Sequence, residues 1–213
     1  MSERQRGPGE APNLGTPAEP RPAASVVLLR RGGKHSERAL EVLLLKRSED
    51  AKFMPGVWVF PGGSVDPADG EGEAAYRACA MRELGEEAGI ELPAGEELVL
   101  FSRWITPEVI STRFDAWFFL ALAPAHTPPQ PDGVETVEAA WFRPAAALEA
   151  QAAGDLALAF PTLSQLRSLL EFRTSDEALA AHRGASVEAV LPVVLGDREN
   201  HRVVLPGDPD YPA

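Results

Sequence analysis

The stretch that decides the fold runs from Arg82 to Ile90 and reads Arg-Glu-Leu-Gly-Glu-Glu-Ala-Gly-Ile. It follows a turn that reads Phe60-Pro61-Gly62-Gly63. A helix advances about 100° per residue, so Glu86 and Glu87 lie within about 60° of Glu83 on one face. Clustered carboxylates raise one another's pKa values until a cation neutralises them, and Mg²⁺ prefers oxygen ligands. The pattern therefore predicts a helix with a metal-binding face behind a glycine turn.

An ordinary amphipathic surface helix is the alternative interpretation of the same residues. Leu84, Ala88 and Met81 fall on the side opposite the carboxylates, and exposed acidic runs are common in soluble proteins. The fixed spacing of the three glutamates to Arg82 and Gly89 and the upstream glycine pair favour the functional interpretation.

The segment from Gly63 to Ile90 resembles the Nudix box. That family pattern is Gly, five residues, Glu, seven residues, then Arg-Glu-U-x-Glu-Glu-x-Gly-U, with U a bulky aliphatic residue. Its second half is matched at each fixed position by Arg82, Glu83, Leu84, Glu86, Glu87, Gly89 and Ile90. The resemblance implies an α/β/α sandwich around a mixed β-sheet, where periodicity alone indicates only a fold of helices and strands. It also implies a pyrophosphohydrolase that uses Mg²⁺, or Mn²⁺ in its place.

The first half of the box departs from the pattern. Gly63 precedes Arg82 by 19 positions, whereas the family spacing is fourteen, so the loop from Ser64 to Glu73 carries extra residues. The early family glutamate falls on Ala74. Glu73 and Glu71 remain as alternative replacements for it.

Site residues follow from the resemblance. Glu86 and Glu87 are the first expected metal ligands, and Glu83 is either a third ligand or the general base. The carbonyl of Gly62 is a further expected ligand, and Gly63 permits close approach of a phosphate. Arg82 is expected to hold a carboxylate in place through charge-assisted hydrogen bonds.

A remote acid and several cations complete the predicted site. Glu135 is expected to be a further ligand or an alternative base, with Glu138 as its rival. The expected substrate-binding residues are Gly63, Arg47, Arg103 and Arg113. For the glutamates and the arginines alike, a solvated surface role is the alternative.

Softer markers resemble one branch of the family, the peroxisomal coenzyme A diphosphatase-like group and its bacterial relatives. They are the inserted loop and the segments Phe53–Gly56, Arg103–Pro107, Arg113–Asp115 and Leu205–Asp208. This branch implies coenzyme A or acyl-CoA as substrate. The alternatives are an ADP-ribose or nucleotide-sugar pyrophosphatase and a nucleotide-sensing Nudix module without catalysis.

Composition limits the setting. The net charge of −12 argues against a nucleic-acid partner, because such surfaces are normally basic. The chain has no apolar run of about 18 residues, so no membrane partner is expected. A single cysteine, Cys79, excludes an internal disulfide and is consistent with a cytoplasmic location. The expected partner is a small nucleoside-diphosphate compound, and the resemblance allows a homodimer.

Three parts of the chain are expected. Residues 1–22 are rich in Pro and Gly and predict a disordered tail, residues 23–145 form the Nudix core, and residues 146–213 form a C-terminal helical extension and tail. Asp69 is expected to cap a helix from Glu73 to Ala88 that ends at Gly89. Further helices are predicted over residues 145–153, 162–172 and 175–183, and strands over residues 24–30, 40–46, 56–60, 97–104, 112–122, 136–142, 187–194 and 202–205.

Overall fold

The computed structural model describes residues 12–31, 40–51, 53–196 and 201–212. Its strands are β1 (Arg21–Arg31), β2 (Leu40–Arg47), β3 (Trp58–Val59), β4 (Gly62–Ser64), β5 (Val99–Ile105), β6 (Phe114–Leu122), β7 (Thr136–Phe142), β8 (Ala189–Val190), β9 (Val193–Gly196) and β10 (His201–Val204). Its helices are α1 (Gly72–Ala88), α2 (Pro144–Ala153), α3 (Phe160–Leu169) and α4 (Ser175–His182), with a 3-10 helix, η1, at Pro67–Asp69.

A mixed sheet forms the centre of the molecule, in the order β3-β2-β1-β6-β5-β8, with β4 paired to β1 and β7 paired to β2. The strands β1 and β6 run parallel, whereas β1 pairs antiparallel with β2 at one end and with β4 at the other. The short β4 therefore fills the place beside β1 that β2 leaves free. Gly62 and Gly63, which the sequence predicted in a turn, thus pair with β1 as part of the sheet.

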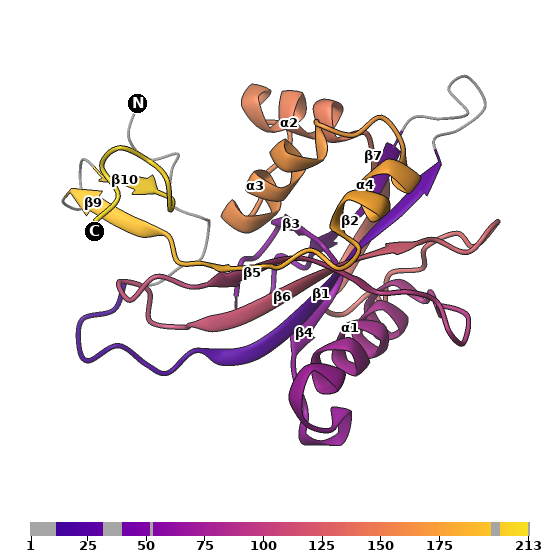
Figure 1. Cartoon of the computed structure of the whole chain (residues 1–213), viewed down its shortest axis with the longest axis horizontal. Helices are drawn as coiled ribbons and strands as arrows, with labels where there is room; N and C mark the ends of the chain where they lie inside the picture. Colours follow the sequence, from indigo (N-terminus) through magenta and orange to yellow (C-terminus); the bar gives the residue numbers. More distant parts are fainter. Residues whose placement is uncertain (1–11, 32–39, 52, 197–200, 213) are drawn as a thin grey trace.

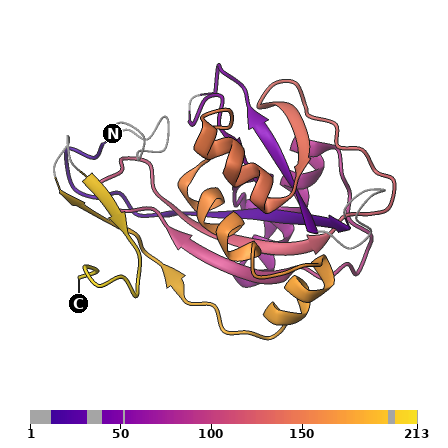
Figure 2. The same ribbon diagram turned by 90° about the horizontal axis from the view of Figure 1, so that it is seen from above.

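Helices cover both faces of the sheet (Figure 1). On one face α1 packs its apolar side, including Leu84 and Ala88, against alternate residues of β1 and β2. On the other face α2, α3 and α4 pack over the intervening residues, and Figure 2 shows these helices lying across the strands. This arrangement confirms the predicted α/β/α sandwich. It also explains why residues Val42–Leu45 are continuously apolar, since all four are fully buried between the two helical layers.

The helix boundaries agree with the sequence prediction to within a turn. Helix α1 ends at Gly89, which adopts the left-handed conformation at φ 63°, where glycine is favoured. One part of the amphipathic pattern was wrong, because Met81 is 43% exposed rather than packed on the apolar side. None of the described helices combines the length and the hydrophobicity that crossing a membrane requires.

The two ends of the chain differ from expectation. Residues 1–11 of the predicted tail lie outside the described part, but Asn13 donates from its backbone to Val109 O at 2.7 Å and Arg21 begins β1. The segment after residue 11 is mostly exposed, but hydrogen bonds hold it at Asn13 and its last residues belong to β1. Near the C-terminus β8 joins the main sheet beside β5, while β9 and β10 form a separate hairpin. Figure 1 shows this C-terminal hairpin projecting to one side of the sandwich.

Candidate functional site

The Gly62-Gly63 turn meets the acidic side of α1 at close range. The backbone N–H of Gly62 donates to Glu87 Oε2 at 2.9 Å. A Cβ at Gly63 would lie 2.3 Å from Glu83 Oε1, and one at Gly62 would lie 2.1 Å from Ser25 Oγ. At Gly62 the backbone of β1 leaves no space for a side chain, whereas a side chain at Gly63 would force Glu83 to move. The glycine pair thus brings backbone against the helix carboxylates.

The three box glutamates differ in exposure. Glu87 is buried, Glu83 is half-buried, and the Glu86 side chain is 60% exposed. Burial raises the pKa of Glu87 to about 7, and the neighbouring charge of Glu83 adds to this, while the Gly62 N–H and Arg47 act in the opposite direction. Burial also raises the pKa of Glu83, against the lowering effect of Arg82. The positive charges of Arg82 and Arg47 therefore do not offset the burial of Glu83 and Glu87.

The buried charge of Glu87 makes stability depend on pH. Above an ordinary pKa of 4.5 the unfolded carboxyl is ionised, whereas the folded one holds its proton up to about pH 7. The folded state binds more protons in this window, so its stability falls as pH rises from 4.5 to 7, by about 3 kcal/mol for a shift of this size. We expect metal-free protein to lose stability over this range relative to Glu87→Gln, as measured by urea denaturation in EDTA. Parallel stability curves for the two proteins would contradict the expectation.

Arg82 connects the acidic residues of the site. Its guanidinium donates to Glu83 Oε1 at 2.8 Å and to Glu86 Oε2 at 3.0 Å. Two further hydrogen bonds, of 3.0 and 2.9 Å, reach both carboxylate oxygens of Asp69, and a fifth reaches Ser64 O at 3.2 Å. This geometry fits the predicted role of Arg82 as a residue that orients carboxylates.

Asp69 has a different role from the predicted one. It does not cap α1, whose N-cap is Glu71 without a side-chain hydrogen bond. Instead it closes a capping box with Asp66 in η1 and faces Arg82, which lowers its pKa. Of the two predicted replacements for the early box acid, Glu73 pairs with Arg77 and Glu71 lies on the exposed loop end. The Asp-Pro-Ala-Asp sequence of the inserted loop was the signal that could have identified η1.

The Asp69–Arg82 pair should stabilise the inserted loop. The Asp69 side chain is only 5% exposed, and hydrogen bonds between charged groups at such positions contribute about 1–3 kcal/mol. We expect Asp69→Asn to lose stability in this range by thermal and urea denaturation. Glu73→Gln is the matched control, because its pair with Arg77 is exposed and such pairs contribute little. Equal losses in the two variants would show that the Asp69 pair has no special role.

The remaining predicted residues divide into two groups. Glu135 and Arg47 line the same cavity as the box residues, and the charge of Glu135 raises the pKa of Glu83 and Glu87. The rival Glu138 is instead paired with Lys46 at 3.0 Å. Asp132, which the sequence analysis did not single out, accepts the backbone N–H of Glu135 at 3.1 Å and thereby orders the loop that presents it.

Arg103 and Arg113 are not among the described residues that line the cavity. Arg103 forms two hydrogen bonds with Asp115, of 2.8 and 2.7 Å, beside Trp117 on the α1 side of the sheet. Arg113 is buried and donates to Thr106 O and Ala18 O, so it fastens the N-terminal segment to the loop before β6. The structure gives both arginines partners within the protein and does not bring them to the acidic group.

A cavity of about 1020 Å³ opens at the glycine turn. Its charged lining residues are Arg47, Asp66, Arg82, Glu83, Glu86 and Glu135. They come from the end of β2, the β4–η1 loop, α1 and the lead-in to β7, and thus gather around Gly62 and Gly63. Glu87 lies just behind this surface. The other described lining residues carry no charge.

The donor chemistry of this acidic end suits Mg²⁺, which takes carboxylate oxygens. As they stand, no three His, Cys, Asp or Glu side chains among the described residues are close enough together to hold a metal ion. Arg82 accounts for part of this, because it draws Glu83 and Glu86 toward itself. Glu86 is exposed and pairs only at the surface with Arg82, and the raised pKa of Glu87 marks a charge that a cation would compensate. The residues therefore fit a divalent cation.

Residues 19–163 match the profile of the family described as NUDIX domain. The "Putative nudix hydrolase 7" of Caenorhabditis elegans is 28% identical over 73% of this chain, which spans 62% of that relative's length. The human "Acyl-coenzyme A diphosphatase NUDT19" is 26% identical over a region that covers 92% of this chain and 81% of the human protein. A crystal structure of a NUDIX hydrolase from Alicyclobacillus acidocaldarius shares the fold, with a TM-score of 0.68 and 24% identity over 76% of this chain and 96% of that chain.

Proposed function

The chain belongs to the Nudix hydrolase family, and on this premise we propose that it cleaves a diphosphate bond in coenzyme A or an acyl-CoA. The products would be 3′,5′-ADP and a 4′-phosphopantetheine compound. The observation that carries the reaction is the meeting of Glu83, Glu86 and Arg82 with the Gly62-Gly63 turn at one end of a large cavity. The relatives named as acyl-coenzyme A diphosphatases support the substrate.

In the proposed reaction a water oxygen bonds to one phosphorus atom. The bond from that phosphorus to the bridging oxygen breaks, and two phosphate monoesters result. Glu83 takes the proton of the water, because it lines the cavity and burial raises its pKa toward that of an effective base. Arg82 donates to Glu83 Oε1 and leaves Oε2 to accept this proton.

Glu86 and Glu87 would hold the divalent cation, with Glu135 and the Gly62 carbonyl as further ligands, while Glu83 acts as the base. When bound, Mg²⁺ would neutralise the negative charge of the diphosphate. Arg47, which also lines the acidic end, offers a positive charge to a phosphate oxygen. Because Gly63 has no side chain, nothing at this position obstructs the Glu83 carboxylate, which a Cβ would meet at 2.3 Å.

Two other functions are alternatives to coenzyme A hydrolysis. An ADP-ribose or nucleotide-sugar pyrophosphatase would use the same acidic end with another substrate. A nucleotide-sensing module would bind without cleaving, and the absence of the early box acid at Ala74 favours it. Asp69 weakens that argument, because it supplies a partner for Arg82 from the inserted loop.

The decisive experiment incubates the purified full chain with Mg²⁺ and, separately, coenzyme A, dodecanoyl-CoA, ADP-ribose, NADH and diadenosine tetraphosphate. Products are identified by mass spectrometry, with EDTA as the control for metal dependence. We expect 3′,5′-ADP from the two coenzyme A compounds. Cleavage of ADP-ribose alone would show that ADP-ribose, and not coenzyme A, is the substrate. Tight binding without any cleavage would support the sensing module.

A further inference from the structure

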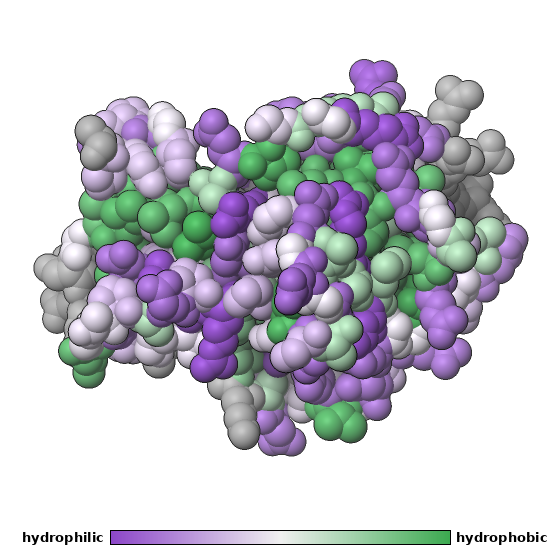
Figure 3. Space-filling view, turned by 60° about the horizontal axis from the view of Figure 1, so that its bottom comes forward, coloured by the Kyte–Doolittle hydropathy of each residue, from purple (hydrophilic) through white to green (hydrophobic). Residues whose placement is uncertain are grey.

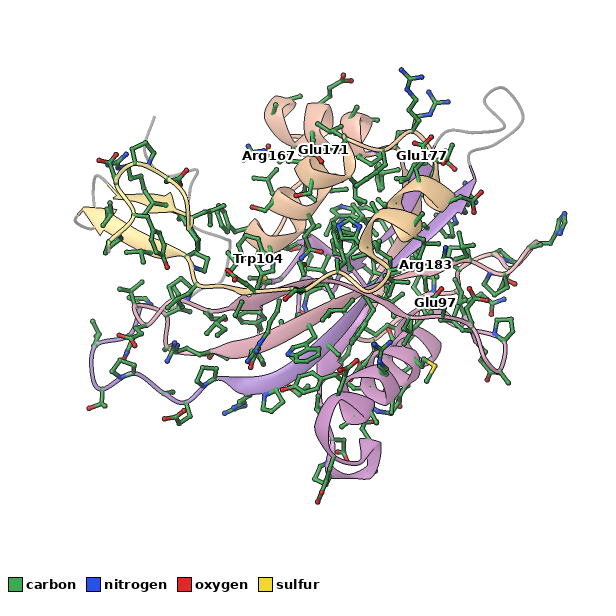
Figure 4. All side chains as sticks on the ribbon, in the orientation of Figure 1. Glu97, Trp104, Arg167, Glu171, Glu177 and Arg183 are labelled. Atoms are coloured by element: carbon green, nitrogen blue, oxygen red, sulfur yellow. The ribbon has the colours of Figure 1, made fainter. Side chains whose placement is uncertain are left out.

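The part of the cavity beyond the acidic end has a floor made of strands. Ser25 lies beside Gly62 and opposite Phe118, and β1 and β6 then run in register to Arg21 and Phe114. Four residues of strand extend about 13 Å, so the Phe114 end lies well away from the glycine turn. Trp104, labelled in Figure 4, adds to this floor from β5 and contacts Phe160 at the start of α3 edge-on.

Both ends of the chain build the walls around this floor. Val194 and Val203 face each other across the C-terminal hairpin, and both line the cavity. Leu14 lines it from the N-terminal segment, and Val109 and Ile110 line it from the loop that holds this segment. Leu14 is 82% and Val109 46% exposed. Figure 3 shows hydrophobic residues gathered on this side of the molecule, between the C-terminal hairpin and the body.

We define the apolar compartment as Leu14, Val109, Ile110, Phe114, Val194 and Val203. The described lining residues from the N-terminal segment, β5, β6, the start of α3 and the C-terminal hairpin carry no charge. Contiguous apolar side chains that line a cavity mark a binding site for an apolar group. The cavity is thus polar and charged at one end and apolar at the other.

Resting on the proposed function, we propose that the apolar compartment holds the fatty acyl chain of an acyl-CoA substrate, so that the enzyme prefers acyl-CoA to free coenzyme A. In such a substrate the pantetheine arm separates the apolar chain from the diphosphate. The cavity likewise has its charged residues at one end and the apolar compartment at the other. A sugar or a second nucleotide at that end would instead leave its polar groups without partners among apolar side chains. The C-terminal hairpin and the N-terminal segment would then set the selectivity, while the box sets the reaction.

The first test measures kcat/KM for coenzyme A and for acyl-CoAs of increasing chain length, all below their micelle concentrations. We expect kcat/KM to rise by about 4-fold for each added methylene until the compartment is filled, since a fully buried methylene contributes about 0.8 kcal/mol. Val194→Glu and Val203→Glu should abolish this rise and leave kcat/KM for free coenzyme A unchanged.

Leu195→Glu is the matched control. It lies next to Val194 on the same strand but on the opposite face, and it does not line the cavity. It should keep the chain-length dependence of the original protein. If it abolishes the dependence as Val194→Glu does, the hairpin matters for folding and not for the acyl chain.

A binding measurement keeps the inference testable even if no diphosphate is cleaved. Calorimetry in EDTA compares dodecanoyl-CoA with coenzyme A, and we expect dodecanoyl-CoA to bind at least 10-fold more tightly, with the difference lost in Val194→Glu. Equal affinities would overturn the inference while leaving the proposed hydrolysis intact. A change from dimer to monomer in Val194→Glu, measured by light scattering, would also overturn it, because the compartment would then be a contact between two copies of the chain.

Discussion

Glu86→Gln is expected to lower kcat by about 10²- to 10⁴-fold with little change in thermal stability. Loss of one charge-stabilising group at a reaction centre typically has an effect of this size. The Glu86 side chain is 60% exposed, and it pairs with Arg82 at 3.0 Å. Its removal should therefore reduce metal binding without disturbing the core. The measurement is kcat as a function of Mg²⁺ concentration, together with the melting temperature.

Glu73→Gln is the control for this prediction. Glu73 lies on the same helix, is 55% exposed and pairs with an arginine four residues away, as Glu86 does, but it does not line the cavity. It should keep kcat within about 2-fold, as expected for a surface charge outside the reaction centre. Turnover by Glu86→Gln near the level of the original protein would contradict the proposed role of the acidic end.

Gly62→Ala is expected to reduce both stability and activity. Its Cβ would lie 2.1 Å from Ser25 Oγ and 2.5 Å from Ala24 O. The second of these is backbone of β1 and cannot turn aside, so β4 must move away from β1. Overpacking of this kind costs about 1–3 kcal/mol, and displacement of the turn by about 1 Å can lower the rate about 100-fold. Urea denaturation and kcat with the best substrate measure the two effects.

Gly85→Ala tests whether the effect is specific to the turn. No atom lies within 4 Å of a Cβ at Gly85, which is in the middle of α1. Because alanine favours a helix over glycine, this variant should gain about 0.5–1 kcal/mol and retain its activity. A Gly62→Ala protein that is as stable and active as Gly85→Ala would show that β4 does not depend on close contact with β1.

Local sequence predicted much of the fold. The apolar run Val42–Leu45 indicated a strand buried on both faces, and the pattern from Glu73 to Gly89 indicated a helix with a glycine stop. Both depend on neighbouring residues, because the repeat of side chains along a strand or helix is fixed by backbone geometry. The family pattern then added the layers of the sandwich and the group of glutamates facing Gly62 and Gly63.

Contacts between distant segments could not be predicted in the same way. Arg103 and Arg113 were expected at the substrate, but Asp115 and the carbonyls of Thr106 and Ala18 hold them. Asp69 was expected to cap a helix, but it pairs with Arg82. An arginine fits several acceptors equally well in chemical terms, so its partner depends on where the folded chain places them.

The sequence by itself determined that three glutamates and an arginine would form one charged group, since all four lie on a single helix that sets their spacing. The place of the glycine pair beside them followed from the resemblance to the family pattern. Only the tertiary structure decided that Glu87 would be buried with a raised pKa, and that the two chain ends would wall an apolar hollow beside this group. Burial and cavity shape depend on how segments far apart in the sequence pack together, and no local periodicity encodes that packing.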